Sequence, residues 1–168
     1  MVTFSAIVPD DGQAVDDVLT LNLDRRRKSR QRVVLDSGAE AALLLPRGTV
    51  LREGDVLRSD DGRHVRVKAA AETLSVVATA DRLQLARAAY HLGNRHLPVE
   101  ITATGLQYQH DHVLDNMVRG LGLPVVMQEG PFNPEGGAYG GHSHGHDHDH
   151  DHDHEPSLLL LSHDHDHS

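Results

Sequence analysis

Cysteine is absent from the 168-residue chain, which excludes disulfides, thiolate nucleophiles, iron–sulfur clusters and cysteine-ligated zinc. Tryptophan is also missing, and aromatic residues make up only 3% of the chain. The longest apolar runs, 41–45 and 158–161, are far shorter than the roughly 20 residues that cross a bilayer. The first residues, MVTFSAIVPDDG, contain no cationic stretch before an apolar core and no cleavage site. The sequence therefore predicts a cytoplasmic protein with no export signal and no membrane partner.

The negative charge of the chain is concentrated at its C-terminal end. The formal net charge is −9, and residues 142–168 contain seven acidic side chains but no Lys or Arg. The first 141 residues contain 18 acidic and 16 basic side chains, so this part is nearly neutral. Because phosphate binding requires a cationic surface, the composition argues against nucleic acid as a partner.

Residues 1–72 are predicted to form a small antiparallel β domain, which we expect to dock a peptide or protein partner. Short β-like runs alternate with turn signals at a spacing of roughly 8–12 residues, as is typical of a barrel or sandwich. A glycine lies in each of the breaks 36–38, 52–55 and 60–62, where turns with positive φ favour it. The expected strands are 18–23, 32–35, 41–45, 49–51, 56–58 and 64–68.

Residues 73–139 are predicted to form a ferredoxin-like domain with the element order β-α-β-β-α-β. A strand over 74–78 is followed by a helix from Asp81 to Leu92, for which Asp81 is the candidate N-cap and Gly93 the end. Strands over 98–103 and 106–109, a helix over 112–121 and a strand over 124–128 complete the order. The predicted fold class of the whole chain is therefore α+β.

Histidine is over-represented, because ten of the 15 histidines lie in the last 27 positions. The tail, residues 140–168, has too little apolar surface to fold alone and is predicted to be disordered until it binds a ligand. The candidate metal ligands in the tail alternate mainly with aspartate; they are His142, His144, His146, His148, His150, His152, His154, His163, His165 and His167.

The chemistry of these side chains favours metal binding over two simpler interpretations. Neutral imidazole is abundant at pH 7 and coordinates nickel, copper and zinc. An engineered affinity tag would lack the regular aspartates, and a solubility tail would need no histidine. The tail is therefore predicted to hold several exchangeable ions, although the residues alone do not select the metal.

His112 is the candidate ligand in the body of the chain. In the helix 112–121, the apolar residues are predicted to share one broad face, and His112 lies opposite its centre. It is either an ordinary surface histidine or, in a homodimer, one of two copies that meet at a two-fold axis. His91 and His96 are expected to cap and pack the end of the first helix, and the pattern assigns no role to His110.

Several motifs in order resemble the UreE family of urease accessory proteins, which are nickel metallochaperones. They are HLGNRHLP at 91–98, DHVLD at 111–115 and GGAY at 136–139 before the histidine-rich tail, together with LLPRG at 44–48 and GDVL at 54–57. The resemblance covers about residues 15–154. It departs in the last predicted strand, where some relatives carry extra histidines and 125–128 has none.

The resemblance implies an N-terminal domain similar to the peptide-binding domains of chaperones and a ferredoxin-like domain that dimerises. It implies that His112 and its symmetry mate bind Ni(II) at the dimer interface, with Zn(II) or Cu(II) as competitors. The implied activity is delivery of nickel to apo-urease together with the UreG GTPase and the other accessory proteins.

Two alternatives to delivery follow from the same residues. A metal-dependent hydrolase needs about three ligands on rigid elements and a general base. The first 141 residues contain no HExxH motif, and their histidines are His64, His91, His96, His110 and His112. We therefore expect no enzyme activity. A general nickel or zinc store, without a urease client, would need no docking domain.

Overall fold

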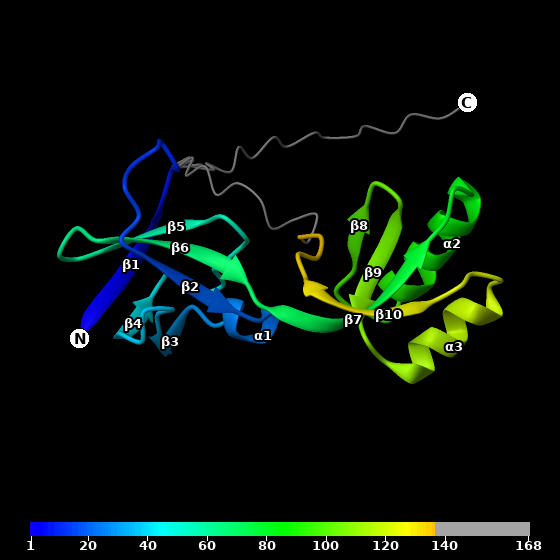
Figure 1. Ribbon diagram of the computed structural model, residues 1–168. Coiled ribbons are helices and arrows are strands. Elements are labelled where there is room, and N and C mark those ends of the chain that lie inside the picture. The colour runs from blue at the N-terminus through cyan, green and yellow to red at the C-terminus, as the bar shows by residue number, and fades with distance from the viewer. Residues whose placement is uncertain (137–168) are drawn as a thin grey trace, which may run out of the picture. The chain divides into compact units, whose positions relative to one another are not determined.

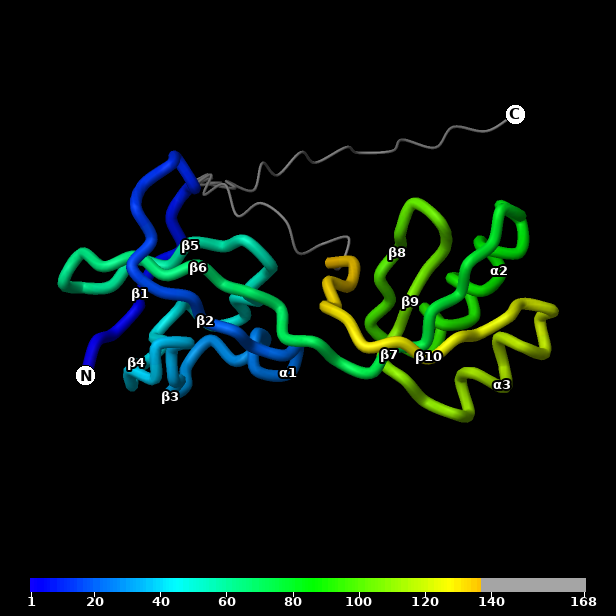
Figure 2. The backbone as a smooth tube through the Cα atoms, in the orientation of Figure 1, coloured from blue at the N-terminus to red at the C-terminus, as the bar shows by residue number. Residues whose placement is uncertain are grey.

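The structure is a computed structural model, and it describes residues 1–136. Two β-sheets account for most of this part, and only Ala70 separates the last strand of the first sheet from the first strand of the second (Figures 1 and 2). No helix within these residues is long and apolar enough to span a membrane. The prediction for the tail falls on residues outside the described part.

The first sheet has six strands in the spatial order β2-β6-β5-β1-β4-β3. The strands are β1 (Val2–Val8), β2 (Asp17–Leu21), β3 (Arg30–Val34), β4 (Glu40–Leu44), β5 (Val56–Ser59) and β6 (His64–Ala69). Three of the pairings are antiparallel, as predicted, whereas β1 with β4 and β2 with β6 are parallel. A short helix, α1 (Leu23–Arg26), follows β2.

Five of the six strands predicted in this region are present, and one prediction is wrong. Residues 49–51 form no strand, although Leu51 is buried and its N–H donates to the carbonyl of Arg26 at 3.0 Å. The predicted strand 18–23 ends early because the Asn22 side chain accepts from the N–H of Arg25 and begins α1. Strand β1 was not predicted.

The core of the first sheet follows from alternation along its strands. In β6, Val65, Val67 and Ala69 are buried, because every second side chain of a strand points to the same face.

The edge strands β2 and β3 approach each other at Asp36, whose N–H donates to the Val18 carbonyl at 2.9 Å. The predicted turn glycines adopt positive φ angles; these are Gly38, Gly54 and Gly62.

The second sheet confirms the predicted ferredoxin-like order. Its elements are β7 (Ala71–Ala78), α2 (Arg82–Gly93), β8 (Glu100–Thr102), β9 (Gly105–Gln109), α3 (His112–Gly120) and β10 (Val126–Pro131). The strands lie in the order β10-β7-β9-β8 and all three pairings are antiparallel. Strand β9 therefore separates β7 from β8, which is the split β-α-β arrangement.

Both helices cover the face of the second sheet that carries Val77, Leu106 and Tyr108 (Figure 1). Helix α2 begins as predicted, because the Asp81 carboxylate accepts from the N–H groups of Leu83 and Gln84. It ends at Gly93, also as predicted.

Arg26 is buried, and it holds the segment that follows β10. One guanidinium nitrogen donates to the carbonyl of Phe132, and another donates to the Asn133 side-chain oxygen at 3.3 Å. The remaining nitrogen, Nε, has no hydrogen-bond partner within residues 1–136. Burial lowers the pKa of Arg26, while the negative charges of Glu72 and Glu53 raise it. The last described residues before the tail are therefore anchored by one buried cation.

We expect Arg26→Ala to lower the free energy of unfolding by about 3 kcal/mol, because it leaves a cavity and unsatisfied buried oxygens. Urea denaturation followed by circular dichroism measures the loss. Arg27→Ala is the matched control, since Arg27 is exposed, and should change the value by less than about 0.5 kcal/mol. Equal losses in the two variants would contradict the anchoring role of Arg26.

Candidate metal-binding site

His112 is the first residue of α3, and its side chain is exposed. The carboxylate of the preceding residue, Asp111, caps the helix by accepting from the N–H groups of Leu114 and Val113. These two hydrogen bonds lower the pKa of Asp111 below its ordinary value. The predicted outward orientation of His112 is confirmed, and its role as a ligand stays a prediction.

The buried face of α3 differs in part from the predicted one. Leu114 and Val118 are buried as expected, but Val113 is 53% exposed. Asp115 is buried in its place, with an exposed fraction of 4%. A carboxylate is tolerated there only because other side chains satisfy it.

Asp115 accepts two short hydrogen bonds from the second sheet. The hydroxyl of Ser75 in β7 donates to its Oδ1 atom at 2.6 Å, and the hydroxyl of Tyr108 in β9 donates to the same atom at 2.8 Å. Ser75 and Tyr108 are themselves buried. Burial, and then the hydrogen bond to Asp115, raise the pKa of Tyr108 far above its ordinary value, so this hydroxyl keeps its proton at neutral pH.

His110 joins this buried cluster from the exposed side. Its Nδ1 atom lies 3.1 Å from the Ser75 hydroxyl oxygen and 3.3 Å from Oδ2 of Asp115, and its side chain is 34% exposed. A histidine whose one nitrogen faces a carboxylate while the ring reaches solvent is the usual arrangement of a metal ligand. Periodicity missed this residue; the available signal was an acidic residue, Asp115, on an otherwise apolar helix face.

His91 and His96 lie at the end of α2, and both are exposed. The ring of His91 contacts the ring of Tyr90 edge to face, with centroids 5.4 Å apart. His96 has a φ of 56°, the only positive φ of a non-glycine residue within residues 1–136. Its N–H donates to the Gly93 carbonyl at 2.9 Å, so it closes the helix end as predicted. Left-handed backbone at a histidine is strained, and such strain occurs often at functional sites.

We expect His96→Gly to raise the free energy of unfolding by about 0.5–1 kcal/mol, because glycine adopts positive φ without a steric penalty. The matched control is His91→Gly, which places glycine in the last turn of α2 and should lower the value by about 1 kcal/mol. Thermal or urea unfolding of both variants gives the comparison. If His96→Gly were also destabilising, the imidazole would contribute a contact that outweighs the strain.

The described body brings together His110, Ser75, Tyr108 and Asp115, but not a complete metal site. Within residues 1–136 no group of three or more His, Asp or Glu side chains is placed to hold a metal ion. A metal bound at His112 or His110 would therefore need ligands from a second copy of the chain, from the tail or from water. The predicted ligands in the tail, from His142 to His167, lie outside the described residues.

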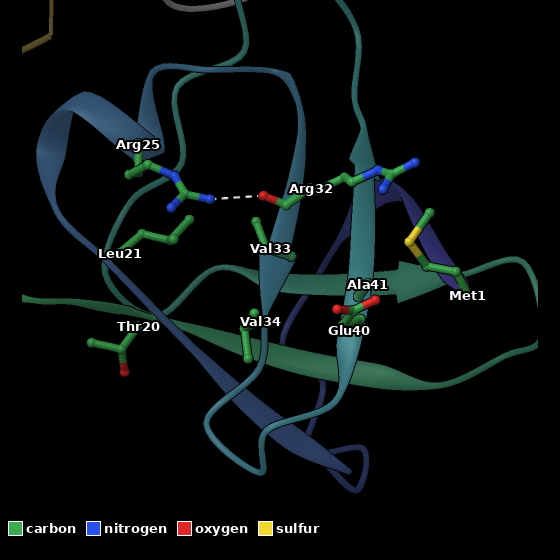
Figure 3. A pocket seen from close by; sticks show the side chains of 9 residues that line it. All are labelled: Met1, Thr20, Leu21, Arg25, Arg32, Val33, Val34, Glu40 and Ala41. Carbon is green, nitrogen blue, oxygen red and sulfur yellow. Dashed lines mark hydrogen bonds between the residues drawn. The ribbon is translucent and has the colours of Figure 1, made fainter.

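A pocket of about 280 Å³ lies on the first sheet, between the edge strands β2 and β3 (Figure 3). Arg25 closes one side by donating to the carbonyl of Arg32 at 2.8 Å. Leu21 and Val33 are buried, whereas Val34 is 60% exposed. The pocket therefore combines apolar surface with two arginine side chains and Glu40, beside β3, which is an edge strand of the sheet.

Comparisons with known proteins cover both sheets and the tail. A family model described as the C-terminal domain of the UreE urease accessory protein matches residues 72–167, and one described as its N-terminal domain matches residues 4–70. A protein named urease accessory protein UreE from Alkalilimnicola ehrlichii is 53% identical, over 84% of this chain and 86% of its own length. Proteins of the same name from Pseudomonas putida and Proteus mirabilis are 52% and 56% identical, over 83% and 73% of this chain and 86% and 76% of their own lengths.

Proposed function

Because the chain belongs to the UreE family of urease accessory proteins, we propose that it is a cytoplasmic nickel metallochaperone for urease maturation. It binds Ni(II) through histidine side chains, passes the ion to apo-urease and catalyses no reaction. The observation that carries the proposal is the coincidence of family membership with ten histidines in the last 27 positions. Imidazole forms exchangeable complexes with nickel, whereas a closed thiolate cage would retain its ion.

The tail captures nickel, and the body holds it for transfer. Alternating histidines allow several imidazoles to share one ion, and tethering keeps the captured ions at high local concentration beside the body. Zn(II) and Cu(II) compete for the same ligands, since copper binds nitrogen ligands more tightly than nickel does.

The body site is centred on His112 and its copy in a homodimer. The exposure of His112 supports this assignment, because a buried imidazole could not meet a second one across a two-fold axis. His110 is the nearest additional ligand, two positions earlier in the chain.

His96 is the second candidate for the shared ligand. Its exposed side chain is held on strained, left-handed backbone that glycine would adopt more easily. Comparing His112→Ala with His96→Ala distinguishes the two assignments, because only the true ligand changes nickel binding by the body.

The pocket between β2 and β3 is the proposed docking surface for UreG and for the complex of apo-urease with its accessory proteins. Strand β3 lies at the edge of its sheet, although its Arg32 carbonyl already accepts from Arg25, and the exposed side chain of Val34 offers an apolar contact beside Arg32. A docking surface is what separates a chaperone from a store, since a store needs no client.

Transfer to apo-urease in the presence of a chelator tests delivery against storage. Nickel-loaded full-length chain is mixed with apo-urease, UreG and the other accessory proteins, and the chelator captures any nickel released into solution. We expect urease activity to develop, and we expect Val34→Asp to slow it by roughly tenfold with its nickel load unchanged. Val50→Asp is the matched control, because Val50 is exposed but does not line this pocket.

The storage alternative predicts a different pattern. A store would release nickel only through solution, so the chelator would prevent activation by the unmodified chain. Equal activation rates for Val34→Asp and Val50→Asp would show that the pocket is not the docking surface. The delivery hypothesis itself would still stand.

A further inference from the structure

The hydrogen atoms of the buried cluster can be assigned by counting its donors. Tyr108 has one hydroxyl hydrogen, and it points to Oδ1 of Asp115 at 2.8 Å. Ser75 also has one, and it points to the same oxygen at 2.6 Å. Because Oδ1 of Asp115 accepts from both hydroxyls, it carries no hydrogen of its own in this arrangement. Both hydroxyl hydrogens of the cluster are therefore directed at Asp115.

This assignment determines the tautomer of neutral His110. The Ser75 oxygen lies 3.1 Å from Nδ1 of His110, and it can only accept there because its own hydrogen is directed at Asp115. Oδ2 of Asp115 lies 3.3 Å from the same nitrogen. Nδ1 must therefore carry the hydrogen, and Nε2 keeps its lone pair. No residue within 1–136 forms a hydrogen bond with that Nε2 atom.

We propose that Asp115 and Ser75 are positioning residues that lock His110 as the Nδ1–H tautomer, so that Nε2 is presented to a divalent cation such as Ni(II). The inference rests on the proposed nickel-binding function. Ser75 belongs to β7 and Asp115 to α3, so two regular elements fix the ring. Tyr108 supports Asp115 and does not touch the ring nitrogen. A group that accepts a hydrogen bond from the other ring nitrogen orients a metal-binding histidine. It also makes the free nitrogen a stronger electron-pair donor to the metal.

The experiment uses the full-length chain in which the ten tail histidines are replaced by asparagine, which we call the tail-silent chain. The chain is labelled with ¹⁵N-histidine and studied without metal at pH 7.5, and His110→Gln assigns its signals. We expect the ¹⁵N shifts of His110 to show a hydrogen on Nδ1 and a lone pair on Nε2. The tautomer is read from the chain with an intact cluster, and His110→Gln serves only to identify which signals belong to His110.

Asp115→Asn is the decisive variant. Its amide oxygen still accepts from Ser75, but its NH₂ group replaces Oδ2 and donates toward Nδ1, so the hydrogen of His110 moves to Nε2. We expect the ¹⁵N pattern to reverse and the Ni(II) affinity of the tail-silent chain to fall about 10–100-fold. Tyr108→Phe is the matched control: it removes a hydrogen bond from the same carboxylate, lowers Tm, and leaves the tautomer unchanged.

Three results would overturn the proposal. The first is a hydrogen on Nε2 of His110 in the tail-silent chain. The second is unchanged nickel affinity in a folded Asp115→Asn variant. The third is unchanged affinity after His110→Ala, which would exclude His110 as a ligand. The nickel-binding function itself would survive all three, because His112 and the tail are tested separately.

Discussion

Replacing the ten tail histidines with asparagine is expected to remove most of the nickel that the chain binds. If about three imidazoles hold each ion, the ten tail histidines bind roughly three ions per chain. The proposed shared body site would add about half an ion per chain, because two copies would hold one ion. Calorimetric titration of the full-length and tail-silent chains with Ni(II) measures both capacities.

The matched control for this change keeps every histidine and removes the acidic partners. Replacing the tail aspartates with asparagine alters six positions: Asp147, Asp149, Asp151, Asp153, Asp164 and Asp166. Capacity should stay near that of the full-length chain, because carboxylate is a harder ligand that suits magnesium and calcium better than nickel. A larger loss from the aspartate changes than from the histidine changes would contradict an imidazole reservoir.

Nickel affinity is expected to fall steeply as the pH drops from 7.5 to 5.5. Only the neutral imidazole has a lone pair for the metal, and its ordinary pKa is about 6.5. At one pH unit below this pKa, protonation of each histidine ligand weakens nickel binding by about tenfold. The nickel affinity of a site with two imidazoles therefore falls by about 100-fold. Competition with a nickel-sensitive dye at a series of pH values measures the effect.

The number of histidines in a site determines the steepness of this pH dependence. The tail-silent chain should show the slope of the body site alone, and the full-length chain should show a steeper one. An affinity that does not change between pH 7.5 and 5.5 would show that carboxylates or backbone groups hold the metal in place of imidazoles.

Local signals in the sequence predicted the second sheet and its helices well. Asp81 marked the start of α2, and Gly93 marked its end, because caps depend on residues within one helical turn. Strand β1 could not be found in this way. The residues of β1, Val2–Val8, are mostly of types that favour strands, but its partners β4 and β5 come much later in the chain, so its pairing could not be read from neighbouring residues.

The candidate site was only partly predictable for the same reason. The outward orientation of His112 follows from helical periodicity, which involves only its own helix. The burial of Asp115 depends on hydroxyl donors from β7 and β9. The residue pattern of α3 alone does not indicate that Ser75 and Tyr108 lie against Asp115. The contacts of His110 could not be predicted either, since this histidine becomes distinctive only beside the buried carboxylate.

Nickel titration of the tail-silent chain, with and without His112→Ala and with the mass measured in solution, is the most direct test of the proposed nickel site shared by two copies of His112. We expect a dimer that binds about one ion per two chains, and we expect His112→Ala to abolish this binding. Binding that survives His112→Ala but is lost in His96→Ala would contradict the assignment and place the shared ligand at the strained end of α2. A tail-silent chain that binds no nickel would contradict the existence of a body site.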